Sequence, residues 1–192
     1  MSYAVIYNAD AFDDSNRLLE FYNLNIVKVA ELLETPTTDI PDNIAIILEE
    51  GDTSSYCREK LRIRYGVKNG KILEDKGRLI HEAAHVVQNY PHRIYPGHPY
   101  WCWSEGIADY CRNELDDTFS LEEGLSFDPQ KGYRDAAHFL VWLSTRHPPV
   151  LIKMNRLFRL KGEQLNNPDQ IFQQLVQENY NQLHREYICQ QI

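Results

Sequence analysis

Hydrophobic and polar residues follow different periods along the chain, and these periods predict strands in the first 73 residues and mainly helices after them. Residues 3–7 (YAVIY) are rich in β-branched and aromatic side chains, which favours a strand. Residues 44–48 form a short apolar run that is typical of a buried strand. Residues 61–67 alternate apolar and basic side chains, which predicts a half-buried or edge strand. Asn69 and Gly70 then predict a tight turn.

Apolar residues recur at helical spacing over residues 15–33, so a helix is expected there. Two prolines and several turn-forming residues predict a loop at residues 34–43. Five more helices are predicted, at residues 74–90, 104–115, 133–145, 150–160 and 168–187. Ser104 is expected to cap the second of these, and Asn167 to cap the last, with Pro168 in its first turn.

The order of the elements, strands first and helices later, predicts the α+β class. We expect one domain over residues 1–192. Residues 1–73 would form its strand-rich part, a mixed sheet with one helix. Residues 74–192 would form a mainly helical part that carries the functional site.

Composition and charge limit the classes of function that the chain can have. The 192 residues are 43% hydrophobic and 25% charged, as in globular proteins. A net charge of -8 argues against binding to nucleic acid or to an anionic membrane surface, and no apolar run is long enough to span a membrane. The four cysteines show no CxxC pairing, and the start MSYAVIYNADAFDD lacks the features of a secretory signal. We therefore expect reduced thiols and a cytoplasmic location.

The stretch HEAAH holds the strongest candidate chemistry. His81 and His85 are four residues apart, so on a helix both imidazoles lie on one face and can reach one metal ion. Glu82 follows His81 and can act as the general base toward a zinc-bound water without binding the metal itself. Two solvated histidines on an ordinary helix would show the same spacing, so the motif needs a third ligand.

Two arrangements can supply a third ligand. In the first, a glycine and a histidine follow the pair, but Gln88 and Pro91 occupy those positions and His92 comes one residue too late. In the second, a carboxylate on the next helix completes the site, and Glu105 fits that position. Asp109 lies one turn beyond Glu105 and could accept the second ring N–H of a ligating histidine.

Three ordered stretches, HEAAHVVQ, SEGIADYCR and KGYRDAAHFL, resemble the basic secretory protein family of peptidases, which are gluzincin-like with HExxH plus ExxxD. The resemblance implies a zincin-like domain in which His81, His85 and Glu105 bind Zn²⁺. It also implies that Glu82 is the general base, that Asp109 supports a ligand, and that the substrate is a peptide or protein.

This resemblance covers about residues 44–187 and is strongest over residues 79–143. The chain is acidic, whereas the family is often basic, and His138 stands where the family commonly has a basic residue. Tyr133 belongs to the third stretch and is predicted to stabilise an oxyanion, although packing at a helix start would also explain it. His138 is a second possible donor, but a lone helical histidine more often serves the core or the surface.

Other residues near the motifs receive weaker interpretations. Gln88 shares a helix face with His85 and is given a structural role. Residues 91–103 would either line a cleft or pack their tryptophan rings onto the core. Cys102 is not counted as a ligand, because a catalytic zinc site keeps one position open. The strand at residues 61–67 is a candidate edge for pairing with an extended peptide.

The leading hypothesis is therefore a zinc metallopeptidase that uses a metal-activated water. A catalytically inactive zinc-binding scaffold for a protein or peptide partner is the alternative. A hydrolase of a non-peptide amide is a third hypothesis, because the same chemistry serves other carbonyl groups.

Overall fold

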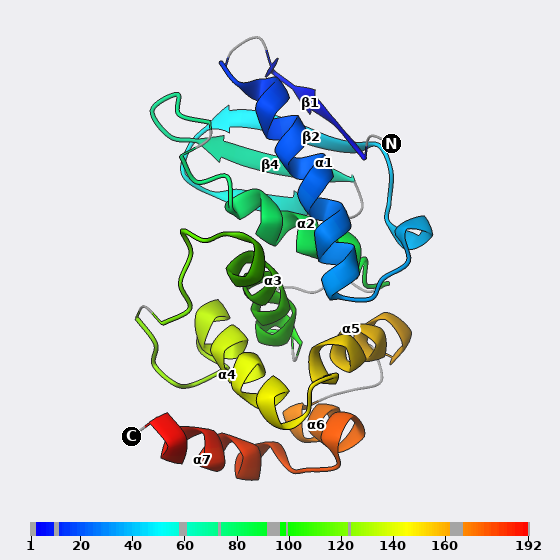
Figure 1. The fold of residues 1–192 in the computed structure, drawn as a ribbon, viewed down its shortest axis with the longest axis vertical. Coiled ribbons are helices and arrows are strands. Elements are labelled where there is room, and N and C mark those ends of the chain that lie inside the picture. The colour runs from blue at the N-terminus through cyan, green and yellow to red at the C-terminus, as the bar shows by residue number, and fades with distance from the viewer. Residues whose placement is uncertain are drawn as a thin grey trace. The chain divides into compact units, whose positions relative to one another are not determined.

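The computed structural model describes residues 3–9, 12–57, 61–72, 74–91, 97–98, 100–122, 124–161 and 167–191. Its strands come first and its helices dominate afterwards, so the predicted α+β class is confirmed (Figure 1). The chain divides into two compact units. One consists of Met1–Asn89 with Glu114–Phe119, and the other of Tyr90–Asn113 with Ser120–Ile192. The single domain expected over residues 1–192 stays a prediction.

The first unit contains a four-stranded sheet in the order β1-β2-β4-β3. The sheet is mixed, as the sequence predicted, but the sequence did not predict β3 or the strand order. Its strands are β1 (Ala4–Tyr7), β2 (Ile44–Glu50), β3 (Ser54–Cys57) and β4 (Arg62–Val67). Strands β1, β2 and β4 are parallel, and β3 runs antiparallel to β4. The buried residues of β2 and β4 face the core on one side of the sheet.

Of the two alternatives predicted for residues 61–67, a half-buried strand or an edge strand, the edge strand is wrong. Strand β4 pairs with β2 on one side and with β3 on the other, so it offers no free backbone to a peptide. Its alternating basic residues reflect the exposed face of the sheet, where Arg64 forms an ion pair with Glu49 of β2 at 2.9 Å. After β4, Asn69 and Gly70 both have positive φ angles, 53° and 69°, which confirms the predicted tight turn.

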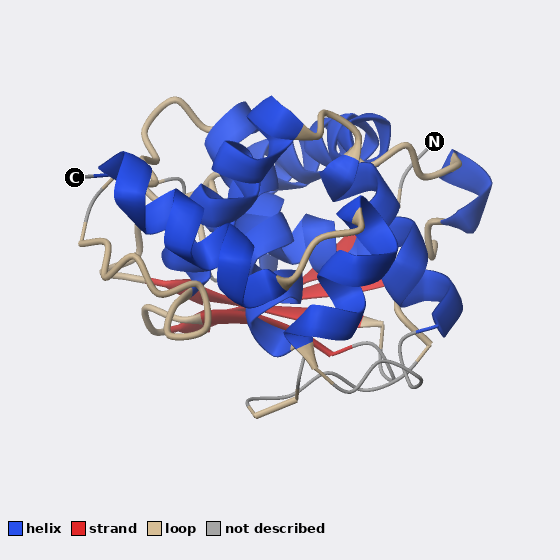
Figure 2. Ribbon diagram, turned by 90° about the horizontal axis from the view of Figure 1, so that it is seen from below, coloured by secondary structure: helices blue, strands red, loops and turns tan. Residues whose placement is uncertain are grey.

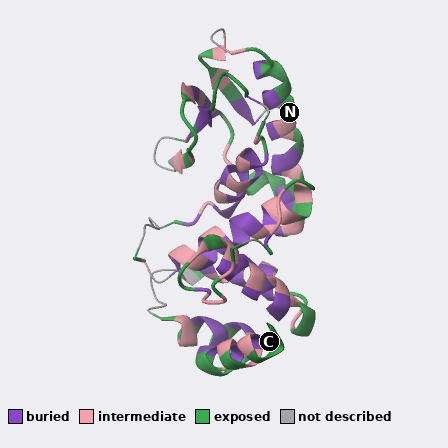
Figure 3. Cartoon of the chain, turned by 90° about the vertical axis from the view of Figure 1, so that its left-hand side faces the viewer, coloured by how far each residue is buried: buried purple, intermediate pink, exposed green. Residues whose placement is uncertain are grey.

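Helix α1 (Ser15–Leu32) lies across the sheet and also contacts α2 (Arg78–Gln88) (Figure 1). Its inward residues recur at helical spacing and include Leu18, Ile26 and Val29, which are fully buried. Figure 3 shows buried stretches in strands and helices alike. Helix α2 is shorter than the predicted helix at residues 74–90. Turns precede it, and Asn89 ends it with a left-handed φ of 39°.

The second unit contributes helices and loops, whereas all the described strands belong to the first (Figure 2). Its helices are α3 (Trp101–Leu115), α4 (Tyr133–Arg146), α5 (Val150–Lys161), α6 (Pro168–Val176) and α7 (Tyr180–Gln191). Aromatic side chains form much of its core. The Trp103 ring lies 5.0 Å from that of Phe172, and the Phe139 ring lies 5.2 Å from that of Tyr187. No helix in the described part of the chain combines the length and apolarity needed to cross a membrane.

Two further predictions about helix boundaries are wrong. The helix expected at residues 168–187 is interrupted, because Gln177 takes a left-handed φ of 62° and the chain restarts as α7. Ser104 does not cap α3. The helix begins at Trp101, and the Ser104 backbone N–H donates to the Tyr100 carbonyl at 2.8 Å. The predicted cap of α6 is confirmed, because the Asn167 side chain accepts the N–H of Gln170.

Candidate metal centre

Helix α2, which carries HEAAH, is attached to the sheet through its first residue. The Arg78 guanidinium donates to the carbonyl oxygens of Asp52 at 2.6 Å and Gly66 at 3.0 Å. Gly66 is needed in β4 because a Cβ there would lie 2.4 Å from the Thr53 carbonyl oxygen. The apolar face of α2 packs on α1 and β3, which leaves the histidines on its other face half-buried.

His81 and His85 point their Nε2 atoms toward each other at 3.1 Å. Two nitrogens that bind one tetrahedral zinc ion at about 2.0–2.1 Å would lie roughly 3.3 Å apart. The rings are nearly perpendicular, with an interplanar angle of 82°. The pair therefore presents two imidazole nitrogens at a separation that suits one metal ion.

The His85 ring has a second contact that the sequence did not specify. Its Nδ1 lies 2.8 Å from Oε1 of Gln88, whose side chain is only 1% exposed. The sequence interpretation gave Gln88 a structural role. Its i,i+3 spacing from His85 was the available signal for this contact.

Glu82 faces the interior of the first unit and is 5% exposed. Its neighbourhood is poor in solvent. Burial raises the pKa of the Tyr22 phenol well above its ordinary value, and the nearby Tyr56 and Glu82 add to the shift. The Tyr22 hydroxyl has no hydrogen-bond partner among the described residues. Glu82 is thus a buried carboxyl group close to the Tyr22 phenol.

Glu105 belongs to α3 in the second unit, where a glycine next to it allows close helix packing. A Cβ at Gly106 would lie 2.8 Å from the Cβ of Ala136 in α4. The backbone of α3 at Glu105 is therefore held directly against α4. Asp109 lies one turn later and is 6% exposed, and its predicted support of a ligating histidine stays a prediction.

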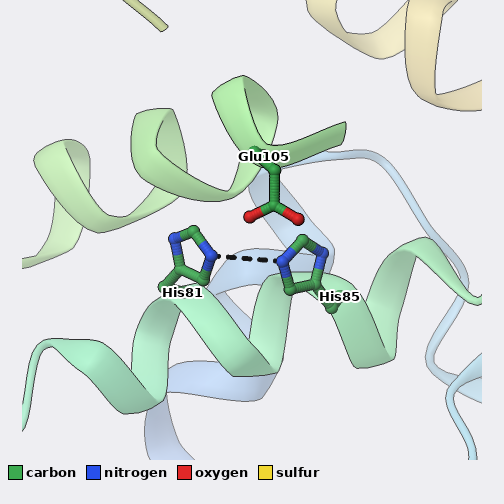
Figure 4. A group of neighbouring side chains, drawn as sticks. All are labelled: His81, His85 and Glu105. Carbon is green, nitrogen blue, oxygen red and sulfur yellow. Dashed lines mark hydrogen bonds between the residues drawn. The ribbon is translucent and has the colours of Figure 1, made fainter. Parts of the chain in front are cut away.

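The candidate ligand atoms of His81, His85 and Glu105 all lie within 4.8 Å of one another. Figure 4 shows the three side chains pointing toward one another, two from α2 and one from α3. Among the described residues, no other group of three or more histidine, cysteine, aspartate or glutamate side chains has this spacing. Two imidazoles and a carboxylate are ligands that suit zinc, and together they form a group that could hold a metal ion.

The two predicted oxyanion donors have different surroundings. Tyr133 begins α4 and is 39% exposed, with its ring 5.0 Å from that of Trp101. His138 contacts two side chains: its Nδ1 lies 2.7 Å from the Tyr187 hydroxyl, and its Nε2 lies 3.3 Å from a Glu122 carboxylate oxygen. The first contact connects α4 with α7, and the second connects α4 with the loop that precedes it. A catalytic role for Tyr133 or His138 stays a prediction.

The sequence allowed two interpretations of residues 91–103: they line a cleft, or they pack their tryptophan rings onto the core. Trp103 is 1% exposed and packs on Phe172, as the core interpretation predicted. Cys102 donates its thiol to the Gln130 carbonyl at 3.1 Å, and burial raises its pKa. His92 lies outside the described residues.

A histidine pair on one helix with a nearby carboxylate is the arrangement of an HExxH-type metal site. In a comparison with protein families, residues 55–187 match the family described as "Peptidase of plants and bacteria" (BSP). The match covers more than two thirds of the chain, so the chain belongs to this family, and the predicted resemblance is confirmed. Searches of curated proteins and of solved structures give no significant match. Membership of a peptidase family implies a peptide or protein substrate.

Proposed function

We propose that the protein is a zinc-dependent peptidase of the gluzincin type. One observation carries the proposal: His81, His85 and Glu105 gather their ligand atoms within 4.8 Å in a chain that belongs to a peptidase family. Three protein ligands leave the fourth position of a tetrahedral zinc site open, as catalytic sites require. A zinc ion held there would supply a water molecule that ionises near neutral pH and a positive charge for the developing oxyanion.

The chain's own residues supply the remaining chemistry. Glu82 follows the first ligand and accepts the proton of the attacking water at its carboxylate. Glu82 is only 5% exposed, so its carboxylate interacts more strongly with a nearby cation than it would in bulk water. Tyr133 is the first residue of α4, and its hydroxyl donates a hydrogen bond to the oxyanion.

Substitution of the proposed base tests the mechanism. Glu82→Gln keeps the size of the side chain and removes its ability to take a proton. We expect zinc content equal to that of the wild type and cleavage of a broad peptide library lower by about 10²–10⁴-fold. Turnover retained in Glu82→Gln would overturn the role of Glu82. Zinc uptake without cleavage by the wild type would instead favour the inactive scaffold.

A cytoplasmic location belongs to the same proposal. It is supported by Cys102, Cys111 and Cys189, which form no disulfide bond among the described residues. Fractionation of the native organism's cells, followed by detection of the protein, would test it.

A further inference from the structure

Gln88 is the last residue of α2, and its side chain turns back over the preceding turn of the helix. Long helical side chains lean toward the N-terminus, so position 88 naturally covers position 85. The Gln88 side chain is 1% exposed, and its Oε1 lies 2.8 Å from Nδ1 of His85. A hydrogen bond at this distance satisfies the buried Oε1 of Gln88 and Nδ1 of the half-buried His85.

The chemistry of this contact fixes the position of a proton. A neutral imidazole has one N–H and one lone pair, and an amide oxygen can only accept. The proton of His85 must therefore sit on Nδ1, which leaves the lone pair on Nε2. This Nε2 is the atom that lies 3.1 Å from Nε2 of His81.

We propose that Gln88 is a positioning residue that holds His85 in the tautomer whose Nε2 can bind a metal ion. The inference rests on the proposed function in that His85 must be a metal ligand for the tautomer to matter. Ligating histidines usually donate their second N–H to a carboxylate, a backbone carbonyl or water. Here a neutral amide takes that place, so the ring is oriented without adding a negative charge beside it.

The tautomer can be read directly in the metal-free full-length chain. We would record ¹⁵N–¹H correlations of the histidine rings at about pH 8.5, two units above the ordinary histidine pKa of about 6.5. We expect His85 to be protonated at Nδ1 in the wild type and to become a mixture of tautomers in Gln88→Met, which keeps the volume and removes the acceptor. A wild-type His85 protonated at Nε2 would overturn the inference.

A matched control separates this effect from loss of packing. Val87 is fully buried beside Gln88 on the same helix, so Val87→Ala should lower stability without changing the His85 tautomer. Gln88→Glu keeps an accepting oxygen and should keep the wild-type tautomer. If Val87→Ala shifts the tautomer as much as Gln88→Met does, the effect comes from packing and the inference is wrong.

Zinc affinity provides a second readout. We expect Gln88→Met to bind zinc about 10–100-fold more weakly than the wild type, and Gln88→Glu to remain close to it. Equal zinc affinity in Gln88→Met and the wild type would overturn the inference. A wild type that binds no zinc would overturn the proposed function, whereas the tautomer measurement, made without metal, tests the Gln88 contact independently.

Discussion

Gly106 of α3 lies so close to Ala136 of α4 that a Cβ on the glycine would be 2.8 Å from the Cβ of the alanine. It would also lie 3.0 Å from the Ala136 carbonyl carbon and from the Ala137 nitrogen. Because two of these neighbours are backbone atoms, the helices would have to move apart to make room. The close approach holds the backbone beside Glu105, the proposed third metal ligand, against α4.

The first prediction concerns the close contact between Gly106 and Ala136. Alanine normally stabilises a helix interior by about 1 kcal/mol relative to glycine, but overpacking costs about 1–3 kcal/mol. We expect the overpacking term to dominate, so that Gly106→Ala lowers the free energy of unfolding by about 1–2 kcal/mol. Urea denaturation would measure the change.

The double variant Gly106→Ala/Ala136→Gly is the control for that prediction, because it removes one of the clashing methyl groups. Its loss of stability should be smaller than the sum of the two single losses. A Gly106→Ala variant that is more stable than the wild type would show that the helices are not held in close contact.

Tyr133→Phe tests the proposed oxyanion donor. The substitution removes only the hydroxyl and keeps the ring that contacts Trp101 at 5.0 Å. We expect kcat/KM for peptide cleavage to fall by about 10²–10³-fold, with unchanged zinc content and thermal stability. Steady-state kinetics that match the wild type would assign Tyr133 to packing alone.

Stability of the second unit should decrease at high pH. Burial, the largest cause, raises the pKa of Tyr180 to about 12. An exposed tyrosine in the unfolded chain has a pKa of about 10, so the unfolded state loses its proton first. The stabilising contribution is therefore complete below about pH 10 and is lost as the pH rises toward about 12.

The Tyr180→Phe variant provides the comparison for this pH dependence. Phenylalanine keeps the ring that stacks on Phe172 at 5.5 Å and on His184 at 5.6 Å but cannot ionise. Urea midpoints measured from about pH 9 to about pH 11.5 should fall less steeply in the variant than in the wild type. Parallel curves for the two proteins would contradict the prediction.

Several features of the site could be predicted from local spacing. His81 and His85 lie on one face of a helix wherever that helix packs, and the spacing of Glu105 from Asp109 follows the same rule. The tight turn at Asn69 and Gly70 also depends only on local backbone preferences.

The features that were missed depend on residues distant in sequence. Strand β3 (SSYC) has little apolar character, and only its pairing with β4 makes it a strand. Because of the same pairing, β4 is an internal strand, which excludes the edge position that was one of the two predicted alternatives. The need for glycine at position 106 follows from contact with Ala136, thirty residues later, and no local pattern predicts it.

The metal content of the purified protein tests the central claim most directly. We would compare the wild type with His81→Ala and Glu105→Ala, and with His147→Ala as a control, because His147 contacts Glu178 at 3.0 Å and is not among the proposed ligands. We predict about one zinc ion per chain in the wild type and the control, and a clear loss in both ligand variants. A wild type that takes up no zinc, or a Glu105→Ala variant that retains it in full, would contradict the account.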